Sequence, residues 1–473
     1  MLFNTLQYAK FFAIVFVASW LLVRVRRVRI VFLLLASYYF YAAFDYRFMP
    51  LIFASSTADW WLARRIGAIR EPMARKRLLW ITVALNLGLL GFFKYYDFGV
   101  ESLGAALGYL GYHPPEWALR LTLPIGISFF TFESMSYVID VYRGDIEPHP
   151  SYLEYLTFVA FFPHLVAGPI VRPRDLLPQL ARTARFSAEL GAEGLFLIAL
   201  GLVKKVAIGD YLALNLVDRV FDAPLRYSSL ECYLAVVSYA LQIYCDFSGY
   251  TDIAIGSALL LGVRFPKNFD APYTAHSIVD FWRRWHISLS TWLRDYLYIS
   301  LGGNRHGRAR TYLNLILTML LGGLWHGANW TFVAWGALHG AALAATRAFA
   351  PFFAQLFRSV PKLLVRALGV LFTFHLVCLG WILFRAETFT KARLLLQRLT
   401  EGSVYHPNLD RRVLLVIALG LLGHFIPARW FSSLQTGFCR LPAVAQAALL
   451  FGVLLLVRQV ASAEAVPFVY FQF

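Results

Sequence analysis

The stretch that decides the fold lies between residues 311 and 346 and reads TYLNLILTMLLGGLWHGANWTFVAWGALHGAALAAT. It contains no Asp, Glu, Lys or Arg, and Arg310 and Arg347 stand at its two ends. A helix of about 20 apolar residues crosses the hydrocarbon core of a bilayer, so this stretch is long enough for two crossings. Because the bilayer core offers the backbone no hydrogen bonds, the sequence predicts that both crossings are helices.

The same apolar character extends over the whole chain. Of its 473 residues, 59% are hydrophobic and 15% are charged, compared with about 25% charged residues in soluble proteins. The mean hydropathy is +0.59. Apolar stretches recur from end to end, and the alternating strands of a membrane barrel are absent from the sequence. We therefore expect an all-α integral membrane protein with about eleven transmembrane helices of roughly 20 residues each, organised as a single polytopic domain over residues 1–473.

Basic residues gather in short segments between the apolar stretches. The net charge of +17 arises from 44 Lys and Arg against 27 Asp and Glu. This distribution is typical of cytoplasmic loops, and no nucleic-acid-binding motif accompanies the charge, so we expect no nucleic-acid partner. The cluster Arg24–Arg29 follows the apolar stretch Phe11–Val23, the reverse of a signal peptide. We expect a retained first span with its N-terminus outside. The four cysteines are widely spaced and predict neither a zinc site nor a disulfide framework.

Three polar or Pro- and Gly-containing segments interrupt the apolar stretches. They are Leu121–Gly126, Phe162–Pro169 and Tyr244–Asp252. The last of them contains Asp246 and Asp252, with Gly249 between them as a possible break. Irregular backbone at membrane depth is tolerated only inside protein or beside a wet cavity. The sequence therefore predicts broken helices around a cavity.

Residues 280–296 read DFWRRWHISLSTWLRDY and differ from a span. Large apolar side chains recur every three or four residues and define one face, and charged residues fall largely on other faces. This pattern predicts an amphipathic helix at the membrane interface, which could serve simply as a surface anchor. His286 lies beside the apolar face, where a structural hydrogen-bonding role is the simpler alternative. In the following Gly-rich loop, Asn304 and Arg305 could meet phosphates, although a solvated cytoplasmic turn is the favoured explanation.

His326 is the residue that we expect to do chemistry. Were a helix to begin at Thr311, its rise would place His326 roughly 22 Å further along, within the hydrocarbon core. Polar groups there are functional candidates, and an interhelical hydrogen bond is the alternative. A buried neutral imidazole can accept a proton from a hydroxyl group. No H-E-x-x-H motif suggests a metal and no G-x-S-x-G motif suggests an acyl-enzyme, so direct attack of a hydroxyl on an activated acyl donor is the simpler chemistry.

With these residues in view, the chain resembles the membrane-bound O-acyltransferase (MBOAT) family, and most closely its bacterial alginate O-acetyltransferase branch. The similar blocks are SFFTFESMSY (128–137), FFPHLVAGP (161–169), YCDFSGYTD (244–252), FPKNFDAPY (265–273), and the segments 281–303 and 322–340. They cover a core region of residues 120–345, and the ending PFVYFQF (467–473) is also similar. One departure is Cys245, which stands where a tyrosine is expected.

The resemblance implies a helical shell around a central tunnel in a bacterial inner membrane, with a periplasmic N-terminus. It implies an acetyltransferase that takes acetyl from a cytoplasmic donor, acetyl-CoA, without a bound cofactor or metal. The acceptor is an extracytoplasmic hydroxyl of an exopolysaccharide such as alginate, reached with a periplasmic partner protein. His326 matches the key histidine of the W-H-G motif, and His286 matches the family's second polar position. The further substrate- or donor-binding candidates are Asn304, Arg305, Asp246, Asp252, Trp325 and Asn329.

Two other functions remain open from the sequence. The chain could transfer a different acyl group, such as D-alanine from a carrier protein to teichoic acid. It could also be a transporter whose broken helices hold a substrate near the midplane, although such transporters tend to contain two related halves and no internal repeat is visible.

Overall fold

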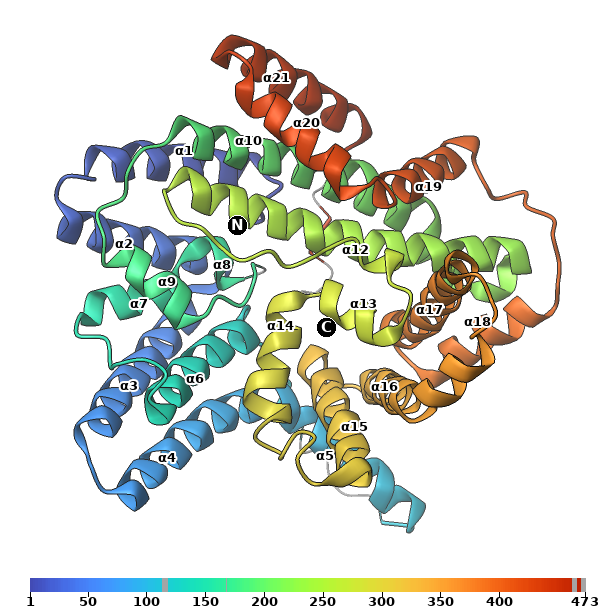
Figure 1. Ribbon diagram of the computed structural model, residues 1–473, viewed down its shortest axis with the longest axis horizontal. Helices are drawn as coiled ribbons and strands as arrows, with labels where there is room; N and C mark the ends of the chain where they lie inside the picture. The colour runs from blue at the N-terminus through green and yellow to red at the C-terminus, as the bar shows by residue number, and fades with distance from the viewer. Residues whose placement is uncertain (113–117, 167, 462–465, 469–473) are drawn as a thin grey trace. The chain divides into compact units, whose positions relative to one another are not determined.

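The computed structural model describes residues 1–112, 118–166, 168–461 and 466–468 (Figure 1). Its regular elements in these ranges are all helical, which confirms the all-α fold class. Ala167 of the FFPHLVAGP block and residues 469–473 of the similar ending lie outside the described residues.

The chain divides into two compact units. The first comprises Met1–Gly194 and Ala254–Pro266, and the second comprises Leu195–Ile253 and Lys267–Phe473. Along the chain, the boundary after Gly194 falls within helix α10 (Ala188–Leu202), and the boundary after Ile253 falls within helix α12 (Ser229–Leu260). All eight residues that the sequence nominates for the site belong to the second unit.

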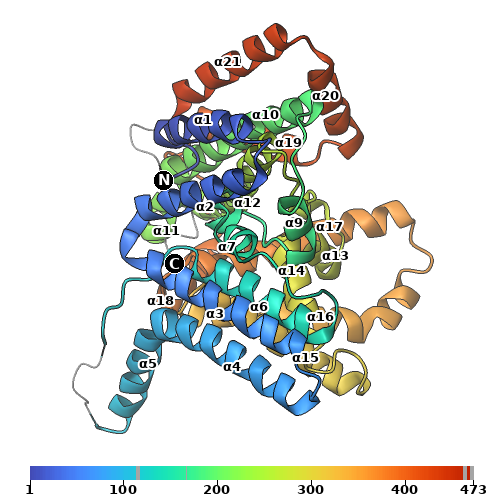
Figure 2. The same ribbon diagram turned by 90° about the vertical axis from the view of Figure 1, so that its left-hand side faces the viewer.

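The first unit contains the N-terminal helices. Its helices are α1 (Leu6–Leu21), α2 (Arg26–Asp45), α3 (Met49–Ala68), α4 (Pro72–Leu90), α5 (Tyr96–Tyr109), α6 (Ile127–Arg143), α7 (Tyr152–Ala160), α8 (Phe162–Leu165), α9 (Pro173–Leu180) and the beginning of α10 (Ala188–Leu202). Helices α3, α4 and α6 lie side by side (Figure 2). A buried guanidinium ties this unit together, because Arg29 donates hydrogen bonds to Ser19 Oγ at 2.9 Å and to the Leu261 carbonyl at 2.6 Å.

The second unit contains the remaining helices. They are the rest of α10, α11 (Asp218–Asp222), α12 (Ser229–Leu260) up to Ile253, α13 (Ile278–Arg284), α14 (Ile287–Trp292), α15 (Gly307–His326), α16 (Trp330–Leu356), α17 (Lys362–Arg385), α18 (Phe389–Thr400), α19 (Arg411–His424), α20 (Ala428–Arg440) and α21 (Ala443–Val460). Shorter helical segments occur in both units. Short π-helical segments cover Gly91–Tyr95, Val203–Asp210, Ala213–Val217 and Leu293–Tyr298. Single 3₁₀ turns cover Tyr46–Phe48, Pro224–Arg226 and Pro272–Thr274.

Several helices are suited to cross a membrane. Among the described residues, four continuous helical segments are long and apolar enough, namely Arg26–Ala68, Pro72–Tyr109, Lys362–Arg385 and Ala443–Val460. Helices α19 and α20 form a fifth candidate, which is bent by 92°. These helices support a multi-pass membrane protein. The expected number of about eleven spans of roughly 20 residues stays a prediction.

Two of the three expected interruptions are confirmed and one is wrong. Helix α6 begins only at Ile127, after an irregular segment that ends at Gly126, and α7 ends at Ala160. In contrast, α12 runs without a break from Ser229 to Leu260. Gly249 serves close packing instead, because a Cβ atom there would lie only 2.7 Å from the carbonyl oxygen of Gly201.

The expected amphipathic helix over residues 280–296 is also wrong. Helix α13 ends at Arg284 and α14 begins at Ile287, with His286 at a left-handed φ of 42° between them. The aromatic face does not anchor the chain at a surface. Trp285 is 1% exposed, and its ring lies 5.1 Å from that of Phe269 and 5.0 Å from that of Trp381. The periodic pattern correctly predicted which side chains are apolar and buried together. These side chains pack against other parts of the protein, whereas the prediction had them face the membrane.

Candidate active site

Helices α15 and α16 form the scaffold of the site, and they lie side by side (Figure 1). Their backbones meet at glycines. A Cβ atom at Gly323 would lie 2.3 Å from the Phe332 carbonyl oxygen, and one at Gly336 would lie 2.3 Å from that of Met319. Only glycine permits this approach, because any larger residue would force the two helices apart. The small residues around the W-H-G motif therefore determine where α15 ends relative to α16.

His326 is the last residue of α15 and is 4% exposed. Its ring centroid lies 5.1 Å from that of Trp325, 5.1 Å from that of Trp335 on α16, and 5.2 Å from that of Phe384 on α17. All three contacts are edge-on, with interplanar angles of 72° to 87°. Aromatic groups from three helices thus hold the imidazole in one place.

His286 lies near the same cluster although it comes from a different motif. Its ring lies 4.6 Å from that of Phe247 on α12 and 6.1 Å from that of Trp325. Trp325 therefore contacts the rings of both histidines, and the structure brings together the two residues that the sequence nominated as catalytic. Trp325 itself is buried.

The backbone of His286 is strained. Its φ and ψ angles of 42° and 56° lie in the left-handed region, which non-glycine residues seldom adopt. Such a conformation costs on the order of 1–3 kcal/mol and persists only where the surrounding structure supports it. The side chains around the break between α13 and α14 must therefore support this conformation.

A small polar network surrounds this break. Asn268 Oδ1 lies 3.2 Å from His286 Nδ1, 3.1 Å from the backbone nitrogen of Ser288 and 2.9 Å from Ser288 Oγ. The Asn268 carbonyl also accepts a hydrogen bond from the backbone of Ile287 at 2.9 Å. His286 lies outside the spanning helices named above, and burial lowers its pKa to about 3. Its imidazole is therefore neutral at physiological pH.

The two carboxylates of the YCDFSGYTD block each pair with a lysine. Asp246 lies 2.7 Å from Lys205 Nζ, which also pairs with Asp210 at 2.6 Å. Asp252 lies 2.7 Å from Lys204 Nζ. The sequence analysis missed both lysines, although two adjacent lysines inside the apolar stretch 194–215 were a visible signal. Charge neutralisation inside the protein explains these carboxylates without a bound substrate.

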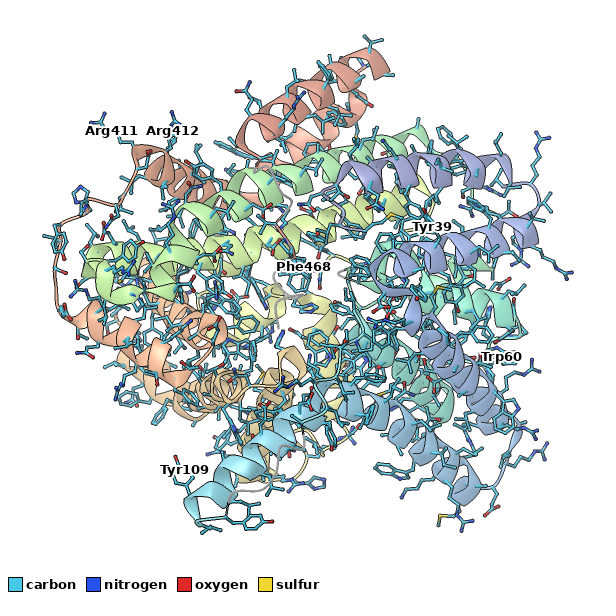
Figure 3. The ribbon with its side chains drawn as sticks, turned by 180° about the vertical axis from the view of Figure 1, so that it is seen from behind. Tyr39, Trp60, Tyr109, Arg411, Arg412 and Phe468 are labelled. Atoms are coloured by element: carbon cyan, nitrogen blue, oxygen red, sulfur yellow. The ribbon has the colours of Figure 1, made fainter. Side chains whose placement is uncertain are left out.

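The last described residues reach into the second unit (Figure 3). Phe468 is fully buried, and its ring lies 4.6 Å from that of Tyr250 and 5.5 Å from that of Phe247. Phe247 in turn contacts His286. Phe468 thus packs behind the phenylalanine that contacts His286. In contrast, Arg411 and Arg412 point outward from the start of α19 (Figure 3).

The remaining candidates lie at different distances from the histidines. Asn304 and Arg305 are exposed in the turn before α15. The 20 residues of that helix separate them from His326 by about 30 Å at 1.5 Å per residue. Asn329 caps α16, because its Oδ1 accepts the Thr331 N–H at 3.0 Å, and its Nδ2 donates to the Glu387 carbonyl at 2.9 Å. The structure therefore gives Asn329 a capping role and places Asn304 and Arg305 away from the histidine cluster.

Comparison with known proteins identifies the family of this chain. A model of the MBOAT, membrane-bound O-acyltransferase family, matches residues 117–385. The chain belongs to this family. Within the matched segment lie both histidines and every other candidate site residue.

The relatives of this MBOAT protein are named for three different acyl-transfer activities. It is 48% identical over 370 residues to a protein of Azotobacter vinelandii named "Probable alginate O-acetylase AlgI", covering 77% of this chain and 71% of the relative. It is 39% identical to the peptidoglycan O-acetyltransferase of Helicobacter pylori, covering 76% and 71%. It is 28% identical to the teichoic acid D-alanyltransferase of Bacillus subtilis, covering 59% and 72%. The chain is therefore an MBOAT O-acyltransferase and a membrane protein, which decides against the transporter alternative.

No group of three or more His, Cys, Asp or Glu side chains that could hold a metal ion occurs among the described residues of this MBOAT protein. The histidines instead meet aromatic rings and amide groups. The groups of this cluster that can accept or donate a proton are the imidazole nitrogens of His286 and His326, which lie among aromatic rings.

Proposed function

We propose that this O-acyltransferase moves an acetyl group from acetyl-CoA in the cytoplasm to an extracytoplasmic hydroxyl, and that His326 is the general base. The observation that carries the proposal is the position of His326. It ends α15 inside an aromatic cluster, next to a tryptophan that also contacts His286. This arrangement occurs in a chain that is 48% identical to a protein named as an alginate O-acetylase.

The proposed reaction is a direct transfer. The hydroxyl oxygen of the acceptor forms a bond to the thioester carbonyl carbon, and the carbon–sulfur bond breaks. The hydroxyl proton moves to a ring nitrogen of His326 and then to the leaving thiolate, so that the products are an acetyl ester and free thiol. General-base catalysis of this kind contributes about 10²–10⁴-fold in rate. The aromatic groups around His326 would exclude water, which would otherwise hydrolyse the thioester.

The donor would enter at the N-terminal end of α15, beside the turn that contains Asn304 and Arg305. Because about 30 Å of helix separates these residues from His326, we assign them to the distal phosphates of the donor rather than to its reacting carbonyl. An arginine and a glycine-rich turn are suited to phosphate oxygens. We place this end in the cytoplasm, and the N-terminus in the periplasm of a bacterium with an inner membrane.

The acceptor that we propose is an exopolysaccharide such as alginate, reached through a periplasmic partner protein. The proposal rests on the name of the Azotobacter relative. Transfer of D-alanine to a teichoic acid is the second candidate, because the Bacillus subtilis relative is named for it. The mass of the ester released from the acceptor polymer by mild alkali distinguishes the two, since acetate and alanine differ in mass.

The test of the proposal is the replacement His326→Ala, with polymer-bound acetyl ester as the measurement. We expect acetylation to fall by about 10²–10⁴-fold at unchanged abundance in the membrane. His339→Ala is the matched control. His339 is also buried and its ring lies 4.7 Å from that of the same Trp335, so both replacements leave a cavity beside one indole. Normal ester levels in the His326→Ala strain would refute the assignment of the base.

A further inference from the structure

The orientation of one buried amide, that of Asn268, follows from the hydrogen bonds around it. Its Oδ1 atom lies 3.1 Å from the backbone nitrogen of Ser288. A backbone N–H can only donate, so the atom that faces it must be the carbonyl oxygen and not the amide nitrogen. The Ser288 hydroxyl donates to the same oxygen at 2.9 Å. The orientation of the Asn268 side chain is therefore determined by the main chain.

The oriented amide determines the protonation of the histidine. His286 Nδ1 lies 3.2 Å from the same Asn268 Oδ1. A carbonyl oxygen only accepts, so Nδ1 must carry the hydrogen. The ring of His286 is fully buried, which disfavours the imidazolium form. In the neutral ring with a hydrogen on Nδ1, Nε2 holds a free lone pair.

This lone pair has no hydrogen-bond donor in the part of the chain that the structure describes. An unsatisfied buried acceptor costs about 1–3 kcal/mol, and the strained backbone of His286 adds to that cost. The rings near the imidazole are those of Phe247, Phe269 and Trp325. His286 Nε2 is thus a buried acceptor on a ring whose centroid lies 6.1 Å from that of Trp325, the tryptophan that also contacts His326.

We infer that Asn268 is a positioning residue that keeps the proton on His286 Nδ1, so that Nε2 accepts a hydrogen bond from the acceptor substrate, at a hydroxyl other than the one whose proton moves to His326. The main-chain carbonyl of Asn268 also holds Ile287, so this residue supports both the ring and the strained break. The identity of the donated hydrogen rests on the proposed function. The protonation of the ring depends only on the geometry.

The consequence of a wrong tautomer is large. In a hydrolase, exchanging the proton between the two ring nitrogens of the catalytic histidine lowers kcat by about 10⁴-fold. In Asn268→Leu, the amide oxygen that accepts from Nδ1 is absent. The Ser288 hydroxyl, whose Oγ lies 3.5 Å from Nδ1, loses the same oxygen and can donate to Nδ1 instead, which places the ring hydrogen on Nε2. In Asn268→Asp, a carboxylate oxygen still accepts from Nδ1 and from the Ser288 N–H.

The first measurement is ¹⁵N NMR of the full chain in lipid bilayers, with ¹⁵N-labelled histidine. The signal of His286 is the one that His286→Ala removes. We expect it to report a proton on Nδ1 in the wild-type protein and a proton on Nε2 in Asn268→Leu. A wild-type signal with the proton on Nε2 overturns the inference, even if no variant of Asn268 can be produced.

The second measurement is acetyl transfer per folded molecule. We expect a loss of about 10²–10⁴-fold in Asn268→Leu and rescue to within about tenfold of wild type in Asn268→Asp. Asn86→Leu is the matched control, because Asn86 is a buried asparagine of the first unit that bonds to Asp59. We expect it to retain the wild-type tautomer and transfer rate. Wild-type transfer by folded Asn268→Leu overturns the inference. Absence of transfer by the wild-type protein refutes the proposed function instead, and the NMR signal still decides the tautomer.

Discussion

The two W-H motifs of this protein place their histidines in opposite ways. In the W-H-G motif, His326 ends α15 and Gly327 follows it with an extended φ of −164°, so the helix stops without strain. In the W-H-I-S motif, His286 itself adopts the left-handed conformation. The first arrangement depends on small residues nearby in the sequence. The second depends on Asn268, which lies 18 residues earlier. Residues nearby in the sequence therefore determine where α15 ends, whereas the break at His286 depends on a residue from an earlier segment.

Replacing Gly323 should have the largest effect, because it removes the basis of the W-H-G arrangement. In Gly323→Val, the new side chain would collide with the Phe332 carbonyl, which lies 2.3 Å from the Cβ position. Since neither backbone can move without separating α15 from α16, we expect almost no folded protein in the membrane. The measurement is abundance and detergent resistance. Gly437→Val is the control, because nothing lies within 4 Å of its Cβ position. Normal abundance of Gly323→Val would show that the close packing is dispensable.

Replacing the two histidines together tests whether they act as one unit. Each single alanine variant should lose about 10²–10⁴-fold in transfer rate. If both rings are needed to hold and activate one acceptor molecule, the His286→Ala/His326→Ala protein should be hardly worse than either single variant, because residues that act together are non-additive. The rate of acetyl transfer by purified protein checks this. Losses that multiply would mean that the two rings contribute independently.

The smallest effect is expected from a comparison of two His286 replacements, which measures the backbone strain at this position. Glycine adopts a φ of 42° without a Cβ penalty, whereas alanine does not. We therefore expect His286→Gly to unfold at a higher temperature than His286→Ala, by the equivalent of about 1 kcal/mol, although both lack the ring. Thermal unfolding in one detergent is the measurement. Equal melting temperatures would argue against strain, and the same pair of replacements at His326 should favour alanine, which is the better helix former.

The sequence pattern predicted most of the helices and the burial of His326. The charge-free run 311–346 does contain two helices, and His326 is buried at the end of the first. The wrong predictions concern segments in which the spacing of apolar residues shows that one face is buried but does not show whether lipid or protein covers it. Residues 280–296 have the pattern of an amphipathic helix, yet the chain breaks at His286, and its aromatic face packs against other rings of the same protein.

The candidate carboxylates show the same limit. Asp246 and Asp252 were correctly recognised as unusual in an apolar region, but the sequence could not identify their partners. Lys205 and Asp246 are 41 positions apart, and only folding brings Nζ within 2.7 Å of the carboxylate. Pro467 adds a carbonyl 3.4 Å from the same ammonium group.

Sequence alone determined what depends on composition and on neighbours along the chain. This includes the membrane environment, the helical class and the buried W-H-G histidine, because hydrophobic burial and helix formation act over short segments. Only the tertiary structure decided the partners of the polar groups, namely Asn268 for His286 and the lysines for the two aspartates. Hydrogen bonds and ion pairs require contact within about 3–4 Å, and such contacts between distant segments are set by how the helices pack.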